Sequence, residues 1–237
     1  MIATIVNALA ILAGGTIGLI FKSKISKRFL DIVMLALPLA ILVIGISSAI
    51  ATRDALGMIL CLVVGSIAGE AIGIERGLNS LGERLQKRLS KNKSGAGFTD
   101  AFVASSLLFC VGSMAIMGSL EAGISGNYGI LFSKSLLDGI SAISFAATFG
   151  YGVLFSALPV LFYQGAITLL ATVVAPVLQP EVIAEMSAIG GVLIIALSIN
   201  MLDLRERKIP TGNMLPAILL PIVYQPFVQW ISSLLQG

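Results

Sequence analysis

The sequence contains no histidine and few charged residues, and both scarcities limit what the protein can do. Charged residues make up only 11% of the 237 residues, whereas soluble domains carry about 25%. The missing imidazole removes the commonest transition-metal ligand and the usual proton relay at neutral pH. Cys61 and Cys110 lie inside apolar runs, where a small hydrophobic side chain is expected rather than a disulfide. Any ion chemistry must therefore use carboxylates, hydroxyls, amides or backbone carbonyls.

Sequence motifs of enzymatic catalysis are also missing. The chain has no HExxH motif, no paired-carboxylate motif and no recognisable nucleophile with its base. An intramembrane enzyme is therefore the least favoured function class. We expect no catalytic residues, no cofactor, no bound metal and no nucleic-acid partner.

Apolar residues are abundant instead, at 57% of the chain, and the mean hydropathy is +1.01. A spanning helix needs about 20 apolar residues. The sequence predicts an all-α, polytopic membrane bundle of about eight transmembrane helices in a single domain, with the lipid bilayer as partner. The predicted spans are residues 2–21, 30–50, 58–74, 101–117, 135–178 (two spans), 187–202 and 214–235.

Basic residues gather between alternate spans and predict the orientation of the chain. With eight spans, the clusters at residues 22–28 and 205–208 share one side with a basic amphipathic helix at residues 77–97. The other side carries Glu121 and a short acidic connection with Glu181 and Glu185. Because cytoplasmic loops are enriched in lysine and arginine, both termini are predicted to be periplasmic. The amphipathic helix is expected to lie on the cytoplasmic leaflet.

Small residues interrupt the central spans. Gly112 and Ser113 divide the fourth span, Gly118 and Ser119 are expected to end it, and residues 150–152 offer a break before the sixth span. Weak matches at an offset near 150 residues suggest that the outer thirds of the chain repeat each other. They predict a first repeat at 1–76, central spans at 98–154, and an inverted second repeat at 155–237, a pattern typical of secondary transporters.

Polar residues at membrane depth form the candidate solute pathway. Broken helices are tolerated in a membrane only where they line a cavity or are packed in protein. Lys134 and Asp138 lie four residues apart and can pair on one helix face. Asn7 and Ser144 share this depth, and we assign to the solute or ion pathway Gly112, Ser113, Lys134, Asp138, Ser141, Gln164, Ser198 and Asn200. For any single serine the alternative is a structural hydrogen bond between helices. Asp138, Gln164 and Asn200 taken together favour a role in the solute pathway.

Glu70 is a candidate intramembrane carboxylate near the end of the third run. A functional role and snorkelling to the interface are left open as equal alternatives. Glycines at four-residue spacing indicate close helix packing, and we assign this role to Gly14, Gly18, Gly65, Gly69 and Gly73. These glycine-lined faces also favour a homo-oligomer.

Several segments together resemble the bacterial inner-membrane proteins grouped as YdfK/YqgA-like, a family of unknown function. The resemblance rests on NALAILAGGTIGL, FCVGSMAIMGSLEAGISG, KSLLDGISAISFAATFGYGVLFSALPVLFYQG, SAIGGVLIIALSINML and GNMLPA, and it covers nearly the whole chain. It implies a multi-pass protein of the bacterial inner membrane. It brings no established substrate or functional residue.

The sequence favours a small secondary transporter or facilitator of an unidentified small solute or ion. An ion channel would use the same pathway residues but would conduct without alternating access. A non-transporting scaffold or sensor acting through the helix at 77–97 is the third alternative.

Overall fold

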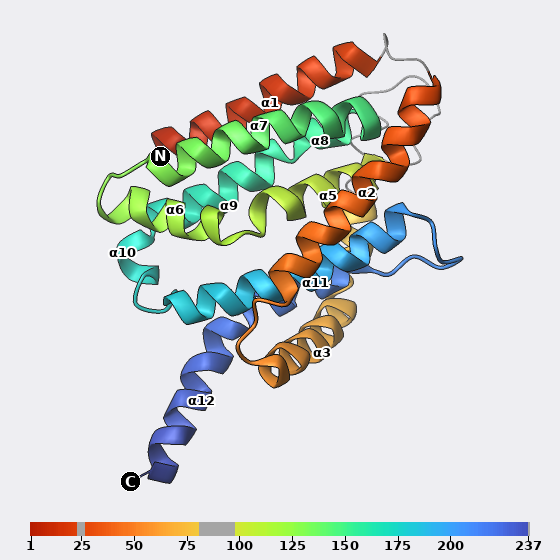
Figure 1. Ribbon diagram of the computed structural model, residues 1–237. Coiled ribbons are helices and arrows are strands. Elements are labelled where there is room, and N and C mark those ends of the chain that lie inside the picture. Colours follow the sequence, from red (N-terminus) through yellow and green to blue (C-terminus); the bar gives the residue numbers. More distant parts are fainter. Residues whose placement is uncertain (23–26, 81–97, 237) are drawn as a thin grey trace.

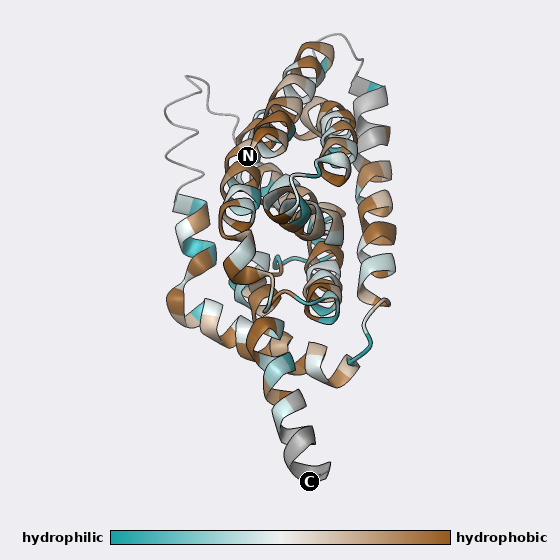
Figure 2. Ribbon diagram, turned by 90° about the vertical axis from the view of Figure 1, so that its left-hand side faces the viewer, coloured by the Kyte–Doolittle hydropathy of each residue, from teal (hydrophilic) through white to brown (hydrophobic). Residues whose placement is uncertain are grey.

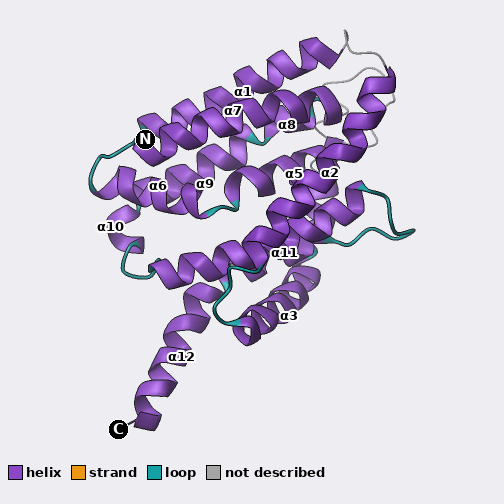
Figure 3. Ribbon diagram, in the orientation of Figure 1, coloured by secondary structure: helices purple, strands orange, loops and turns teal. Residues whose placement is uncertain are grey.

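The computed structural model describes residues 1–22, 27–80 and 98–236, and these residues are folded into helices with no strand among them. The predicted all-α membrane bundle is therefore confirmed (Figures 1 and 3). Residues 74–80 are also helical, and the rest of the predicted amphipathic helix at 77–97 lies outside the described residues. The elements are α1 (Ile2–Lys22), α2 (Lys27–Ala49), α3 (Ala55–Ile72), α5 (Phe98–Cys110), α6 (Ser113–Ile124), α7 (Gly129–Phe149), α8 (Gly152–Phe155), α9 (Ala157–Leu169), α10 (Ala171–Val174), α11 (Pro180–Met201), the 3-10 helix η1 (Thr211–Leu219) and α12 (Pro221–Gln236).

Not all of the eight predicted spans are single long helices in the described part of the chain. Five segments there are long and apolar enough to cross a membrane: α1, α3, α7, α8 with α9, and α11. The α5–α6 pair forms a sixth spanning segment if the two helices, which meet at a 57° bend, are counted as one span. The two remaining predicted spans correspond to α2, whose apolar part is the shorter segment Leu35–Ala49, and to η1 followed by α12.

The predicted helix breaks have different outcomes. Gly112 separates α5 from α6 with extended backbone, so the predicted interruption of the fourth span is confirmed. Gly150 ends α7 with a φ of +88°, which glycine adopts most readily, and the break before the sixth span is also confirmed. The predicted end at Gly118 is wrong, because α6 continues to Ile124. Gly118 is buried against Ile130 and Leu131, and this packing holds the helix together past the glycine.

Three pairs of helices pack antiparallel across the bundle. α1 meets the segment formed by α8 and α9, with Asn7 bonded to Gln164 of α9 at one end and Gly15 against Leu154 of α8 at the other. α2 meets α11, where Ser198 Oγ donates to the Pro38 carbonyl and Gly45 packs against Gly191. α3 meets η1 with Gly65 on Ala217 and Gly69 on Asn213. The predicted repeat pairs the same regions of the chain, with residue matches in the first two pairs.

The glycines assigned to helix packing are used within the chain. A Cβ atom at Gly14 or Gly18 would overlap the backbone carbonyl oxygen of Gly139 or Ile143 on α7. Gly65 and Gly69 lie equally close to the backbone of η1, whereas Gly73 caps α3 with a φ of +77°. The faces from which a homo-oligomer was expected are therefore covered by the chain itself.

Burial differs strongly among the helices. In the most apolar window of α11, 72% of the residues are buried, against 22% in α3. Large apolar side chains such as Leu56, Ile67 and Phe162 are exposed on the outside of the bundle, and Figure 2 shows apolar residues, in brown, spread over the coloured helices. An apolar exterior of this kind requires lipid as its solvent. α12 extends away from the bundle (Figure 1).

Loops that the charge pattern placed on one side lie together in the structure. Lys22 Nζ, at the end of α1, donates to the Thr148 carbonyl near the end of α7 over 3.4 Å. Lys208, in the loop after α11, pairs with Asp100 in the first turn of α5 at 2.5 Å. The basic ends of these helices therefore gather at one end of the bundle.

Candidate functional site

A buried ion pair on α7 is the centre of the candidate site. Lys134 Nζ lies 2.5 Å from Asp138 Oδ2, and the two residues are 6% and 7% exposed. They are one turn apart on the same helix face, so the predicted local pairing is confirmed. Asp138 lies about 14 Å along a helix about 30 Å long, at 1.5 Å per residue. Its carboxylate is thus near the middle of the span.

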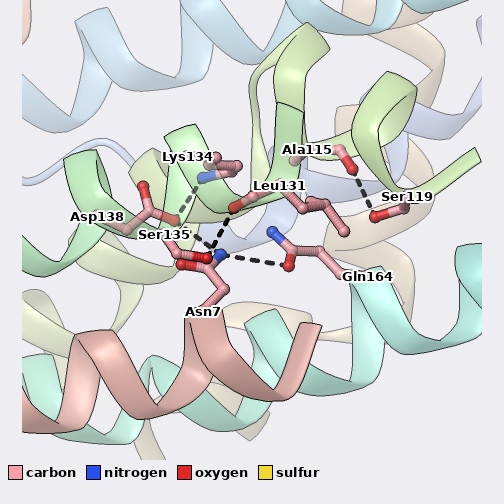
Figure 4. A network of polar contacts seen from close by, with 8 residues as sticks. All are labelled: Asn7, Ala115, Ser119, Leu131, Lys134, Ser135, Asp138 and Gln164. Atoms are coloured by element: carbon pink, nitrogen blue, oxygen red, sulfur yellow. Dashed lines mark hydrogen bonds and ion pairs between the residues drawn. The ribbon is translucent and has the colours of Figure 1, made fainter. Parts of the chain in front are cut away.

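Two amide side chains from other helices complete the centre (Figure 4). Asn7 on α1 donates from Nδ2 to Asp138 Oδ2 over 3.0 Å and to Gln164 Oε1 over 3.2 Å. Asn7 and Gln164 are fully buried, at 0% exposure. Three helices therefore converge on one polar site, with Asn7 as the link between them.

Four buried polar atoms around this centre have no hydrogen-bond partner among the residues that the structure describes. They are Asn7 Oδ1 and Gln164 Nε2 at the centre, and the hydroxyls of Thr4 and Thr168 beside it. Thr4 lies one turn before Asn7, and Thr168 lies one turn after Gln164. Because α1 and α9 are antiparallel, both threonines extend the site in the same direction, toward the N-terminal end of α1. We call this group the polar cluster: Thr4, Asn7, Lys134, Asp138, Gln164 and Thr168.

Backbone geometry brings these helices together. The glycines of α1 let it approach α7 at Gly139 closely enough for Asn7 to reach Asp138. The break at Gly150 then turns the chain back, so that α9 returns Gln164 to the same depth. The nearby hydroxyls of Ser119 and Ser135 donate to carbonyls four residues earlier in their own helices (Figure 4). These two serines are therefore not counted in the polar cluster.

Asn200 and Ser198 lie apart from the polar cluster. Both amide atoms of Asn200 bond the backbone of Ile209, each over 2.8 Å, and so hold the loop after α11. Ser198 Oγ donates over 2.6 Å to the backbone carbonyl of Pro38, which lies inside α2. The structure therefore does not bring Asn200 to Asp138 and Gln164 through hydrogen bonds, because its hydrogen bonds are local, and its role in the pathway stays a prediction.

Other predicted pathway residues lie outside the polar cluster. Ser141 follows Asp138 by three residues on α7 and is half-buried. Gly112 and Ser113 form the break between α5 and α6, where Ser113 is exposed and a Cβ atom at Gly112 would meet nothing within 4 Å. The break thus leaves open space beside the first turn of α6.

Glu70 belongs to a second polar centre, between α3 and η1. Its Oε2 accepts a hydrogen bond from Asn213 Nδ2 over 2.5 Å. A cavity of about 360 Å³ opens at this carboxylate, lined by Ser66, Ile67, Glu70, Pro210, Asn213 and Met214. Glu70 is exposed, and Asn213 holds its carboxylate in place. A smaller cavity of about 40 Å³ lies beside Asn200 and Lys208.

Sequence reasoning missed the surroundings of Glu185 and two buried threonines. Glu185 was expected in an acidic connection, but it is buried in α11 and accepts from the Thr52 hydroxyl over 2.6 Å and the Arg53 N–H over 2.8 Å. Thr4 and Thr168 were not singled out. Their signal was present, because each lies one helical turn from an amide residue inside an apolar run.

The fold and the polar cluster define a polytopic helical membrane protein with a charged centre inside its bundle. The family model "Protein of unknown function (DUF554)" matches residues 2–225, and the chain belongs to this family. It is 34% identical to "Uncharacterized membrane protein YdfK" of Bacillus subtilis (strain 168), over 94% of this chain and 95% of that protein. It is 30% identical to "Uncharacterized protein YqgA" of Escherichia coli (strain K12), over 93% and 94%.

These two relatives confirm the family resemblance read from the sequence motifs. No solved structure matches the chain. Membership brings no assigned activity, so any functional interpretation depends on the polar cluster itself.

Proposed function

We propose that this integral membrane protein is a small secondary transporter or facilitator whose solute binds at the polar cluster. The observation that carries the proposal is the buried Lys134–Asp138 pair with unpartnered amide atoms of Asn7 and Gln164 beside it. Ionisable residues inside a membrane are rare, and they commonly mark substrate or ion pathways. The pair is electrically neutral as a unit. A neutral or zwitterionic small solute would therefore add no uncompensated charge to the site.

The unpartnered atoms argue against a purely structural role. A buried donor or acceptor without a partner costs about 1–3 kcal/mol, and four such atoms border this one site. Apolar side chains of similar volume would avoid that cost. A polar solute that satisfies these atoms would offset it, which gives a reason for the cluster to be present.

The position of the cluster agrees with an inverted-repeat transporter. Asn7 comes from the predicted first repeat, Gln164 from the second, and Asp138 from the central spans. In inverted-repeat transporters the solute site lies near the midplane between the repeats. The antiparallel packing of α1 with α9, α2 with α11 and α3 with η1 supports this repeat relationship. The breaks at Gly112 and Gly150 supply discontinuous helices beside the site.

We further propose that the chain lies in the bacterial inner membrane with both termini in the periplasm, and that it acts without catalysis or a cofactor. The gathering of Lys22 and Lys208 at one end of the bundle supports this orientation. The homo-oligomer remains a prediction without support from the glycine faces.

The test is transport by purified protein in proteoliposomes. Thermal unfolding in detergent is first screened against amino acids, polyols, small amides and small organic acids, because a bound solute raises the unfolding temperature. Solutes that stabilise the protein are then assayed for uptake with wild type and with Asp138→Asn. Saturable uptake and counterflow that the substitution abolishes are expected. Conduction without counterflow would identify a channel, and unchanged uptake by Asp138→Asn would refute the site.

A further inference from the structure

We propose that the cavity at Glu70 binds a phosphatidylethanolamine molecule, with the ammonium group of the lipid on the Glu70 carboxylate. This site is separate from the polar cluster, because its residues come from α3 and the segment around η1 and not from α1, α7 or α9. The inference does not depend on transport. It would hold for a transporter, a channel or a scaffold alike.

The carboxylate is positioned for a ligand by Asn213. The Asn213 side chain donates to Glu70 Oε2 with its nitrogen and accepts the Glu75 N–H with its oxygen over 2.7 Å. The Asn213 backbone is fixed in turn, since it packs directly on Gly69. Asn213 therefore holds one carboxylate oxygen while Glu70 borders the cavity of about 360 Å³.

The charge at the cavity calls for a cationic occupant. The described partner of Glu70 is a neutral amide, and neither of the ion pairs among the described residues involves this carboxylate. A carboxylate beside apolar walls gains from a donor that carries positive charge. The hydroxyl-bearing Ser66 also lines the cavity and offers a second acceptor oxygen.

The lining disfavours a metal ion and favours a lipid. Calcium takes six to eight oxygen ligands, whereas Ile67, Met214 and Pro210 make up half of the residues that line this cavity. No group of three or more metal-binding side chains occurs among the described residues. Ile67 is 65% exposed on the apolar surface of α3, so the cavity opens toward the acyl chains of the bilayer.

Depth and hydrogen-bond chemistry select the headgroup. Glu70 lies about 3 Å along the axis from the end of α3, at the level where headgroups meet the protein. A primary ammonium can donate three hydrogen bonds, as a lysine does, whereas the quaternary ammonium of choline donates none. Arg76 is exposed, and its guanidinium group lies against Gly73. It is available for the lipid phosphate. The cavity volume, at the small end of ligand sites, suits a headgroup.

The experiment is native mass spectrometry of the full-length protein with phosphatidylethanolamine, phosphatidylcholine and phosphatidylglycerol that carry identical acyl chains. Wild type should bind phosphatidylethanolamine about tenfold more tightly than either other lipid, the difference expected for one hydrogen bond to a charged group. Glu70→Gln should lower phosphatidylethanolamine binding to the phosphatidylcholine level. A glutamine oxygen can still accept from Asn213, so this variant keeps the contact between α3 and η1.

Two further variants control the test. Glu121→Gln removes a carboxylate at the other end of the bundle, which bonds Asn127, and should leave lipid selectivity unchanged. Ile67→Trp fills the cavity without changing charge and should weaken phosphatidylethanolamine binding even if Glu70→Gln does not fold. Equal binding of the three lipids, or selectivity that survives both Glu70→Gln and Ile67→Trp, would overturn the proposal. Displacement of the lipid by free ethanolamine at equal concentration would show a site for soluble amines instead.

Discussion

The side-chain nitrogen of Asn7 lies 3.0 Å from Oδ2 of Asp138, although 131 positions separate the two residues in the chain. The same carboxylate oxygen lies 2.5 Å from the Lys134 ammonium. The Asp138 charge is therefore stabilised partly from its own helix and partly from α1. Any movement of α1 along α7 must change the environment of this carboxylate, which couples helix packing to the charge at the centre of the bundle.

Neutralising one member of the ion pair should destabilise the protein, and neutralising both should not. Asp138→Asn leaves Lys134 buried without its partner, and breaking a buried pair costs about 3–5 kcal/mol. The double substitution Lys134→Gln with Asp138→Asn removes both charges and should recover most of that loss. Thermal unfolding in detergent measures both effects.

Uptake in proteoliposomes gives the second measurement on the same variants. If the pair serves the solute, the double variant is stable but does not transport. A double variant with wild-type uptake would show that the pair contributes only to folding.

Close packing of α1 on α7 should make Gly14 intolerant of any side chain. Gly14→Ala would force the new methyl group against the Gly139 carbonyl oxygen, and overpacking of this kind costs about 1–3 kcal/mol. Gly112→Ala is the matched control, because a Cβ atom there meets nothing within 4 Å and the backbone φ of −141° suits alanine. The two variants are compared by thermal unfolding. Equal unfolding temperatures would contradict the packing described for α1.

The sequence-based predictions succeeded where the determining contact was local. Lys134 and Asp138 pair because they are one helical turn apart, which spacing alone reveals. Asn200 lies in an equally apolar run, but its partner is Ile209 in the following loop, and spacing cannot say which polar residues meet across helices. Asn7 was recognised as polar at depth, yet its place between Asp138 and Gln164 depends on long-range packing.

Two similar Gly-Ser pairs show the same limit for helix breaks. Gly112–Ser113 and Gly118–Ser119 look alike in sequence; the first was expected to interrupt the fourth span and the second to end it. The structure bends only at the first. Gly118 has Ile130 and Leu131 against it, whereas Gly112 has no neighbour in the Cβ direction, so tertiary contacts decide which glycine breaks the helix.

The orientation of the bundle can be tested by labelling single cysteines in cells. In a variant with Cys61 and Cys110 replaced by alanine, Ser125→Cys places a thiol on the loop after α6, and Arg205→Cys places one after α11. Both positions are exposed. A membrane-impermeant maleimide should label the first in intact cells and the second only after lysis, because basic loops remain cytoplasmic. The reverse pattern would invert the proposed topology.

Thr168→Val offers a test that separates an effect on stability from an effect on function. The Thr168 hydroxyl is buried and has no partner in the described part of the chain, so its replacement by an apolar group of the same shape should leave the unfolding temperature unchanged or raise it. Thr148→Val is the control on α7, where the hydroxyl donates to the Ser144 carbonyl over 2.8 Å. That loss should destabilise by about 1 kcal/mol without changing solute binding.

The measurement is the rise in unfolding temperature caused by a transported solute, taken for both variants. Thr168→Val should lose most of this rise while the protein without solute stays as stable as wild type, since the hydroxyl serves the solute and not the fold. Thr148→Val should keep the full rise from a lower starting temperature. If Thr168→Val keeps the full solute effect, the bound solute does not reach the end of the cluster toward the N-terminus of α1, and the site is limited to Asn7, Asp138 and Gln164.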